Sequence, residues 1–214
     1  HRIGDDAYQL FPEEGAAGYE RLVRELWGAA NAPTRVLHGW LVTDREIFRP
    51  GSSFLHRNLE RGFTSLLLFA QALAKEAPGK PLHVVTLSTG MQGVGGETAT
   101  LHPEKAAALG PVLVIPKELP GVTTSAIDVA LPAQGGGLLG RSSDASVPAE
   151  VLDGLESELG AAPRDEIVAL RGRARHVLGV QSVALAPGKH PGFKDRGVYL
   201  VTDGLAGVGL AIAQ

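Results

Sequence analysis

The sequence predicts an α/β fold built on a mostly parallel β-sheet. Short apolar runs rich in β-branched residues are typical of buried parallel strands, and amphipathic helical patterns alternate with them along the chain. Two further short runs around a glycine predict a β-hairpin. The expected strands cover residues 35–41, 82–87, 123–130 and 198–201. The expected helices cover residues 18–29, 54–75, 102–118 and 148–159.

Each expected helix has its own signals. From Tyr19 to Trp27, apolar residues recur at i, i+3, i+4 and i+7, which defines the buried face of an amphipathic helix. Pro103 suits the first turn of the third helix, whereas Pro111 and Pro116 are expected to bend or break it. Within the second helix, the side chains expected to face the core are those of Leu59, Phe63, Leu66, Leu67 and Ala70.

The expected hairpin lies late in the chain. Residues 166–170 and 174–178 flank the triplet Arg171-Gly172-Arg173, and we expect them to form an antiparallel appendage to the parallel sheet. Arg171, Arg173 and Arg175 alternate along it and are expected to form a solvated or partner-facing edge. Loops and a linker are expected at residues 43–53, 88–97, 134–147 and 186–196.

Composition excludes several classes of protein. There are no cysteines, so disulfides, thiolate catalysis and thiolate zinc sites are excluded. The net charge is −3 and the 20 Lys and Arg residues form no run, which argues against a nucleic-acid partner. No apolar stretch approaches the roughly 20 residues of a membrane helix, and the N-terminus has no signal-peptide pattern. We therefore expect a soluble, cytoplasmic polypeptide, and its start at His1 suggests a piece of a longer protein.

The terminal segment, residues 198–214, is the most specific motif. An apolar run, a glycine-rich turn and the start of a helix make the first unit of a dinucleotide-binding fold, where a helix N-terminus receives a pyrophosphate. Thr202, Gly207 and Gly209 have the spacing of such a loop. Asp203 replaces its first glycine, and a carboxylate repels a phosphate by about 4 kcal/mol per charge pair at 4 Å and an effective dielectric constant near 20. The segment is thus either a cofactor loop or a purely structural strand–turn–helix.

Three other features have simpler interpretations than the functions they suggest. The glycine-rich residues 88–96 lack the Gly-Lys-Ser/Thr ending of a phosphate loop, so we expect a surface loop. Asp128 could mimic the acidic ribose ligand of a nucleotide fold, but no glycine fingerprint lies about 20 residues before it, so we expect a capping or turn role. The histidines have no metal-ligand spacing, so we expect no metal site. They are His1, His38, His56, His83, His102, His176 and His190.

Several short motifs follow one another in a recognisable order from about Val36 onward. They are Gly62-Phe-Thr-Ser-Leu-Leu with Gln71-Ala-Leu73, then Pro103, Ala106, Leu109-Gly110, Glu118 and Pro120, then Ile127-Asp128, then Glu166, Ala169-Leu-Arg-Gly and Arg173, and finally residues 198–210. In this order they resemble the ketoreductase of modular type I polyketide synthases.

The resemblance implies a truncated Rossmann-like, short-chain-reductase-like domain. Residues 1–196 correspond to the ketoreductase structural subdomain, and residues 197–214 to the first strand–turn–helix of the catalytic, cofactor-binding subdomain, truncated here. The family's catalytic Ser, Tyr and Lys lie beyond this end, so no catalytic residue is carried over. The cofactor-loop positions that match the family are Thr202, Gly204, Leu205, Gly207 and Gly209.

Two departures from the family loop, Asp203 and Ala206, suggest a pseudo-ketoreductase whose NADPH loop is vestigial. The resemblance then implies a non-catalytic structural subdomain that braces the catalytic half or a neighbouring domain in polyketide assembly, without cofactor or activity in this chain. The alternative is half of an active NADPH-dependent ketoreductase that reduces a β-ketoacyl thioester. An independent nucleotide-binding enzyme is disfavoured, since half of the nucleotide fold is missing. The implied partners are the catalytic half, a methyltransferase or dehydratase domain, and the acyl carrier protein.

Overall fold

The computed structural model describes residues 2–4, 7–11, 14–29, 32–43, 53–97, 101–131, 147–184, 194–202 and 204–213. The chain divides into two compact units, His1–Leu178 and Gly179–Gln214. The expected loops at 43–53, 134–147 and 186–196 lie mostly outside the described residues. The expected loop that follows the second strand is confirmed, because residues 89–97 form no helix or strand.

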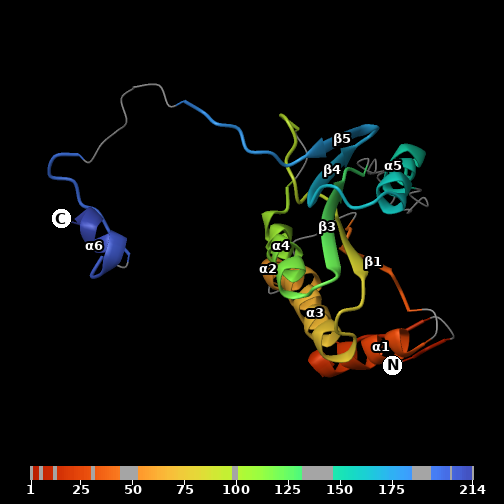
Figure 1. Ribbon diagram of the computed structural model, residues 1–214. Helices are drawn as coiled ribbons and strands as arrows, with labels where there is room; N and C mark the ends of the chain where they lie inside the picture. Colours follow the sequence, from red (N-terminus) through yellow and green to blue (C-terminus); the bar gives the residue numbers. More distant parts are fainter. Residues whose placement is uncertain are drawn as a thin grey trace, which may run out of the picture. The chain divides into compact units, whose positions relative to one another are not determined.

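One five-stranded sheet organises the first unit, with the order β1-β2-β3-β4-β5 (Figure 1). The first four strands are parallel, and β5 pairs antiparallel with β4. The strands are β1 (Arg35–Leu41), β2 (Leu82–Ser88), β3 (Val122–Val129), β4 (Ile167–Arg171) and β5 (Ala174–Val177). The expected α/β fold with a mostly parallel sheet is therefore confirmed.

The hairpin is more closely integrated than the sequence suggested. Its turn at Gly172 is confirmed, with a φ of 56° that suits a residue without a side chain. However, β4 pairs in parallel with β3, so the hairpin is not an appendage. The physical reason is burial, because Val168, Ala169 and Leu170 are all buried and such a run belongs inside a parallel sheet.

The helices follow the expected segments, with shifts of up to two residues at their ends. They are α1 (Ala16–Gly28), α2 (Phe54–Asn58), the π-helix η2 (Leu59–Thr64), α3 (Ser65–Glu76), the 3₁₀-helix η3 (Pro103–Ala108), α4 (Leu109–Glu118), α5 (Ala149–Gly160) and α6 (Gly207–Ala213). Contrary to expectation, Pro111 and Pro116 do not break α4. Pro111 is the third residue of that helix, where an amide has no partner within an α-helix, and Pro116 lies in its last turn.

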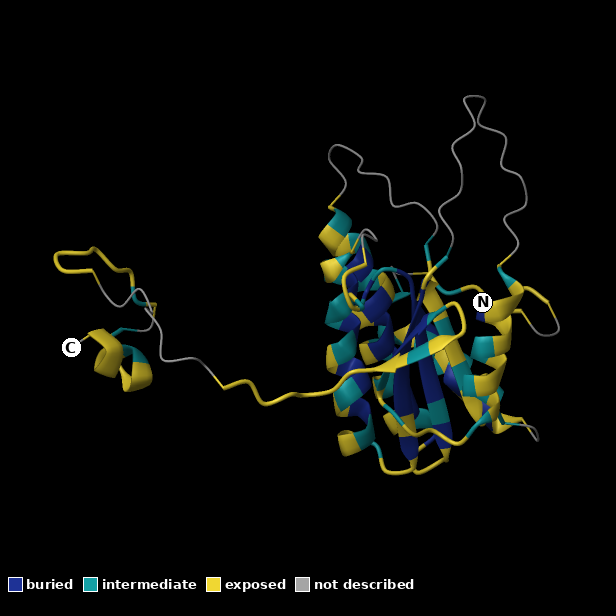
Figure 2. Ribbon diagram, turned by 90° about the horizontal axis from the view of Figure 1, so that it is seen from above, coloured by how far each residue is buried: buried dark blue, intermediate teal, exposed yellow. Residues whose placement is uncertain are grey.

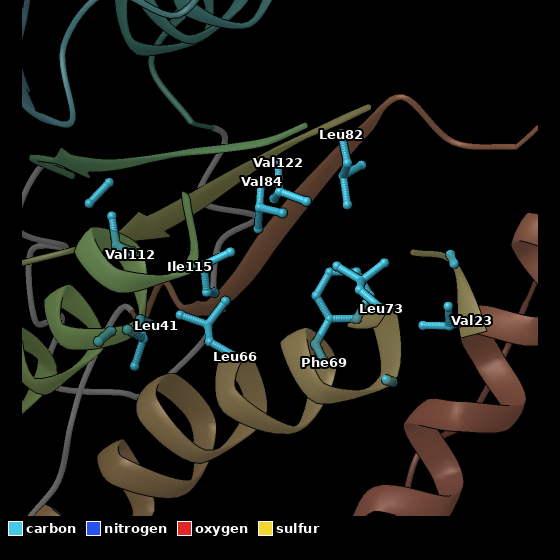
Figure 3. Packing of buried hydrophobic residues seen from close by; sticks show 14 of the residues in the cluster. Val23, Leu41, Leu66, Phe69, Leu73, Leu82, Val84, Val112, Ile115 and Val122 are labelled. Carbon is cyan, nitrogen blue, oxygen red and sulfur yellow. The ribbon is translucent and has the colours of Figure 1, made fainter. Parts of the chain in front are cut away.

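Two apolar clusters pack the opposite faces of the sheet. On the first face, α3 and α4 cover β2 and β3 (Figure 3). Phe69 of α3 also meets Trp27 of α1. On the second face, Val151 of α5 packs with Val85 of β2, Ile127 of β3 and other strand residues. Figure 2 shows the buried strands in dark blue between helices whose outer surfaces are exposed.

The connections between the parallel strands do not all have the same hand. Each strand from β1 to β4 lies on the same side of the one before it, yet α3 and α4 cover one face and α5 covers the other. The connection through α5 therefore has the opposite hand to those through α3 and α4. Nearly all such connections in proteins are right-handed, so this mixture is a rare feature of topology.

The long second helix turns only part of the expected face to the core, where Leu66 and Ala70 pack. Of the expected residues, Leu66 is buried, but Phe63 and Leu67 are 38% and 39% exposed. The cause is Gly62, where an added Cβ would lie 3.0 Å from a methyl of Leu41 and 3.2 Å from the Cβ of Ala108. The helix thus approaches β1 through small residues, and the bulky stripe next to them faces outward. The buried side chains of α3 are those of Ser65, Leu66, Phe69, Ala72 and Leu73.

The second unit does not contain the strand expected at residues 198–201. These residues form no strand, and Val198 and Leu200 are 99% and 94% exposed. A strand requires a neighbour for its backbone hydrogen bonds, and no described residue pairs with this segment. The turn and the helix that follow are confirmed, because residues 204–206 lead into α6. No helix formed by the described residues is long and apolar enough to cross a lipid bilayer.

Candidate functional site

The carboxyl ends of β2 and β3 are where this sheet is expected to form a ligand site. In α/β sheets, ligands bind where the connections from two neighbouring strands leave toward opposite faces and so open a crevice. Here β2 leads to α4 on one face, whereas β3 leads to α5 on the other. The side chains at this point therefore decide whether the crevice can hold a ligand.

Asp128, near the end of β3, occupies this crevice and is fully buried. Its Oδ1 atom accepts hydrogen bonds from Ser88 Oγ at 2.7 Å and from the Met91 amide at 2.9 Å. Its Oδ2 atom accepts a bond from the Gln92 amide at 3.3 Å. The capping or turn role expected for Asp128 is therefore confirmed, since its carboxylate holds the start of the loop after β2.

Arg171, the last residue of β4, closes the same crevice. Its Nη2 lies 2.9 Å from Asp128 Oδ2 and donates to the Gln92 carbonyl at 2.8 Å, and its Nε donates to Glu97 Oε1 at 2.5 Å. Its Nη1 donates to the carbonyls of Asp128 and Leu170, each at 3.1 Å. Burial by itself lowers the pKa of Arg171, but the hydrogen bonds to Glu97 and Asp128 outweigh burial and raise it above its usual value.

The donors gathered in this crevice are those that would bind an anion. Two backbone amides, a hydroxyl and a guanidinium group converge there, and all four bond to the carboxylate of Asp128. The chain's own carboxylate thus satisfies all four of these donors.

The three arginines expected to form a solvated edge have different environments. The side chain of Arg171 is 12% exposed and lies in the crevice. Arg175 pairs with Glu158 at 2.5 Å and with Asp165 at 2.8 Å. Of the three, only Arg173 is exposed. The expectation is therefore wrong for Arg171, because alternation along a strand cannot show which of its side chains meets buried carboxylates. Arg175 is partly exposed on the edge strand β5.

Lys105 in η3 is a fully buried cation that the sequence analysis missed. Its Nζ donates to Thr43 Oγ1 and to the Thr89 carbonyl, each at 2.7 Å, and so joins the ends of β1 and β2. The signal lay in the helical spacing, since a lysine that shares the apolar face of a helix is placed for burial. The residues of that face are Lys105, Ala108, Val112 and Ile115.

The predicted cofactor loop lies in the second unit, Gly179–Gln214. Gly207 begins α6 with a φ of 54°, and Leu205 is 95% exposed. Thr202 and Gly204 lie in the preceding turn, Gly209 lies within α6, and Asp203 is outside the described residues. The structure thus forms the turn and helix, while binding of a cofactor by these residues stays a prediction.

The histidines and carboxylates do not gather into a metal site among the residues that the structure describes. In the described part of the chain, no three His, Cys, Asp or Glu side chains are close enough to hold a metal ion. His38 and His83 lie in β1 and β2 and bond to hydroxyl groups instead: His38 Nε2 lies 2.8 Å from Ser65 Oγ, and His83 Nδ1 lies 2.9 Å from Thr123 Oγ1.

An exposed apolar face along η2, α3 and α4 is a second candidate site. It is defined by Phe63, Leu67 and Val114, which are 38%, 39% and 44% exposed. A Cβ added at Gly110 would contact the ring of Phe63 at 3.6 Å, and Val114 lies one helical turn after Gly110. The face therefore spans two neighbouring helices, as an interaction surface does.

Comparison with known proteins identifies the fold. No protein-family model matches the sequence, and no curated protein matches it. The multidomain structure of the adenylation, ketoreductase and pseudo Asub domains of a keto acid-selecting NRPS module superposes with a TM-score of 0.72 and 19% identity. That match covers 98% of this chain and 17% of the module chain.

Two solved oxidoreductases are less similar. A short-chain dehydrogenase/reductase from Vibrio parahaemolyticus has a TM-score of 0.49, 16% identity and coverage of 78% of each chain. An alcohol dehydrogenase from Thermococcus sibiricus, complexed with 5-hydroxy-NADP, has a TM-score of 0.48 and 15% identity over 80% of this chain and 76% of that one. At these identities, likeness concerns the fold alone: the chain has a Rossmann-like α/β fold that resembles part of a module containing a ketoreductase.

Proposed function

We propose that this chain is the non-catalytic structural subdomain of a ketoreductase within a multidomain synthase of the polyketide or keto acid-selecting peptide type. The observation that carries the proposal is the crevice between β2 and β3, where Asp128 and Arg171 bond to each other in the place of a bound anion. A sheet whose ligand crevice is filled by its own side chains can serve as a scaffold that binds no ligand there. The likeness to a ketoreductase-containing module over 98% of this chain supports the same assignment.

The bracing role needs a surface for a partner, and the apolar face of Phe63, Leu67 and Val114 provides one. We assign it to the catalytic half of the ketoreductase, because the chain resembles a fold in which these two halves belong together. A methyltransferase or dehydratase domain and the acyl carrier protein are further partners in the same synthase.

An active reductase is the alternative, and one observation favours it. Residues 204–213 form the turn and helix of the predicted cofactor loop, with Gly207 in a left-handed conformation. The two functions differ in NADPH binding, for which Asp203 is decisive: its carboxylate adds bulk and negative charge where a pyrophosphate needs close approach to backbone.

The catalytic question is tested with this chain extended through the catalytic half of the ketoreductase, NADPH and the N-acetylcysteamine thioester of acetoacetate. We expect no consumption of NADPH above the buffer rate, with an active short-chain reductase as the positive control. NADPH titration of the wild type and of Asp203→Gly then measures how much Asp203 weakens the binding of NADPH. Turnover, or micromolar binding by the wild type equal to that of Asp203→Gly, would exclude the non-catalytic assignment in favour of the alternative.

The bracing surface is tested by a charge placed on it. Leu67→Glu is expected to weaken association with a separately produced catalytic half of the ketoreductase about tenfold, since a central apolar contact contributes more than 1 kcal/mol. The matched control is Leu152→Glu, on α5 at the opposite face of the sheet, where the leucine is 51% exposed. Equal effects of the two substitutions on binding would exclude the surface as the partner site.

A further inference from the structure

A pocket of about 700 Å³ lies beside β1, the edge strand of the sheet. Its walls come from β1, α1, the continuous helical segment α2–η2–α3 and the N-terminal residues before α1. This volume is within the range of sites that bind small molecules. The pocket is separate from both the crevice and the apolar face described above.

Aromatic side chains form one wall of this pocket. Phe11, Tyr19 and Trp40 line it, and Phe11 and Trp40 remain 37% and 46% exposed. Burial, and secondarily the negative charge of Glu60, raise the pKa of Tyr19 to about 12, so its phenol stays protonated at neutral pH. The wall can therefore cover an apolar group and offer one hydroxyl donor.

Two arginines supply the positive charge of the pocket. Arg57 lines it with a buried Nε that has no hydrogen-bond partner in the structure, and its guanidinium carbon lies 5.6 Å from the ring centroid of Phe54. Among the described residues, neither Arg57 nor Arg61 forms an ion pair through its side chain. A buried N–H without an acceptor is unfavourable, so this guanidinium is placed to receive an anionic oxygen.

The local backbone explains how Arg61 and two further polar residues reach this cavity. Glu60, Arg61 and Thr64 all belong to the π-helix η2 and line the pocket, while Gly62 of the same helix packs against Leu41 in the core. π-helical turns are rare and occur frequently at functional sites. Here the π-helix places polar side chains on the pocket while the glycine keeps the helix against the sheet.

We propose that this pocket binds a small organic carboxylate, with the carboxylate held by Arg57 and Arg61 and the apolar body packed against Trp40 and Phe11. Guanidinium groups bind carboxylates through two parallel hydrogen bonds, and aromatic rings take up an apolar chain or ring. The inference goes beyond the structural role proposed above and does not depend on it.

The test uses octanoate as the probe and 1-octanol as its neutral counterpart. The chain has two tryptophans, so in a Trp27→Phe background the fluorescence of Trp40 reports on the pocket. We expect saturable octanoate binding about tenfold tighter than that of octanol. No saturable binding of octanoate, or equal binding of both probes, would overturn the proposal.

Substitutions of the two arginines then test whether they bind the carboxylate of octanoate. Arg57→Gln and, separately, the exposed Arg61→Gln are expected to weaken octanoate binding about tenfold and leave octanol binding unchanged. Arg173→Gln removes the same charge at the hairpin turn and should change neither affinity. Calorimetric titration gives the affinities and circular dichroism checks that each variant folds. If Arg57→Gln does not fold, Arg61→Gln decides, and unchanged octanoate affinity in that variant overturns the assignment.

Discussion

His38 in β1 shows how a single partly buried residue contributes to the response of this chain to pH. Its Nε2 lies 2.8 Å from Ser65 Oγ, and that hydroxyl donates its own proton to the Arg61 carbonyl at 2.6 Å. His38 therefore donates through Nε2, and protonation would add a proton at Nδ1, which is buried without a partner. Burial accordingly lowers the pKa of His38 to about 4.

The sign of the pH effect follows from this shift. The unfolded chain binds a proton at His38 near pH 6.5, whereas the folded chain binds it only near pH 4, so acid favours the unfolded state. Stability from this residue is complete above about pH 6.5 and is lost by about 3 kcal/mol as the pH falls to about 4. Urea unfolding at several pH values should show a weaker acid dependence in His38→Gln. The exposed His176→Gln is the control, and an unchanged acid dependence in His38→Gln would contradict the mechanism.

Gly62 is the second residue with a measurable consequence. A Cβ there would lie 3.0 Å from Leu41 Cδ1 and 3.2 Å from Ala108 Cβ, which is tighter than most packed carbon contacts, so one of these neighbours would have to move. We expect Gly62→Ala to lower the free energy of unfolding by about 1–2 kcal/mol, since overpacking exceeds the gain in helix propensity. Gly28→Ala in α1 meets no atom within 4 Å and should stabilise the chain by up to about 1 kcal/mol. If both substitutions change the melting temperature in the same direction, the contact at Gly62 is not tight.

At the scale of elements, the features that could be predicted from the sequence are those that depend on the local pattern of apolar residues. The strands of the first unit were identified because runs such as Leu82–Ser88 are apolar on both faces. The face of α3 could not be predicted, because two apolar stripes lie next to each other and only the contact of Gly62 with β1 selects one. The prediction of a strand at residues 198–201 was wrong for a related reason. The sequence of this segment favours a strand, but a strand forms only where a neighbouring strand pairs with it.

The candidate site was predicted in part. Asp128 was correctly expected to hold a turn, because a carboxylate at the end of a parallel strand lies among loop amides. Arg171 was placed at a solvated edge, since its partners Asp128 and Glu97 are 43 and 74 residues away in the sequence. Contacts of that range depend on strand order, which periodicity does not give.

The loop after β2 is expected to depend on Arg171. Arg171→Gln leaves the buried Asp128 without its cation, and the loss of one partner of a buried pair costs about 3 kcal/mol. Hydrogen exchange at the Met91 and Gln92 amides should accelerate with it, because their acceptor is no longer held. Arg173→Gln, at an exposed position of the same hairpin, should change stability by less than about 0.5 kcal/mol. Unchanged exchange at both amides in Arg171→Gln would contradict the role assigned to this arginine.

At the scale of the whole molecule, the buried apolar residues all belong to the first unit. Among the described residues they extend from Val23 to Leu170, and both core clusters lie within His1–Leu178. A polypeptide that ends at Leu178 is therefore expected to fold by itself with a cooperative thermal transition. Circular dichroism across a melt measures this. A broad transition without a cooperative midpoint would show that the core needs residues after Leu178.

The bonds of Arg171 also have a consequence for the rates of folding. They join β4 to residues 74 and 79 positions earlier, so they can form only after the three strands β2, β3 and β4 have been brought into register. Contacts made after the transition state slow unfolding without speeding folding. We therefore expect the chevron of Arg171→Gln to differ from that of the wild type in its unfolding arm. The contacts of Arg171 in the crevice then slow unfolding and so lengthen the lifetime of the folded state.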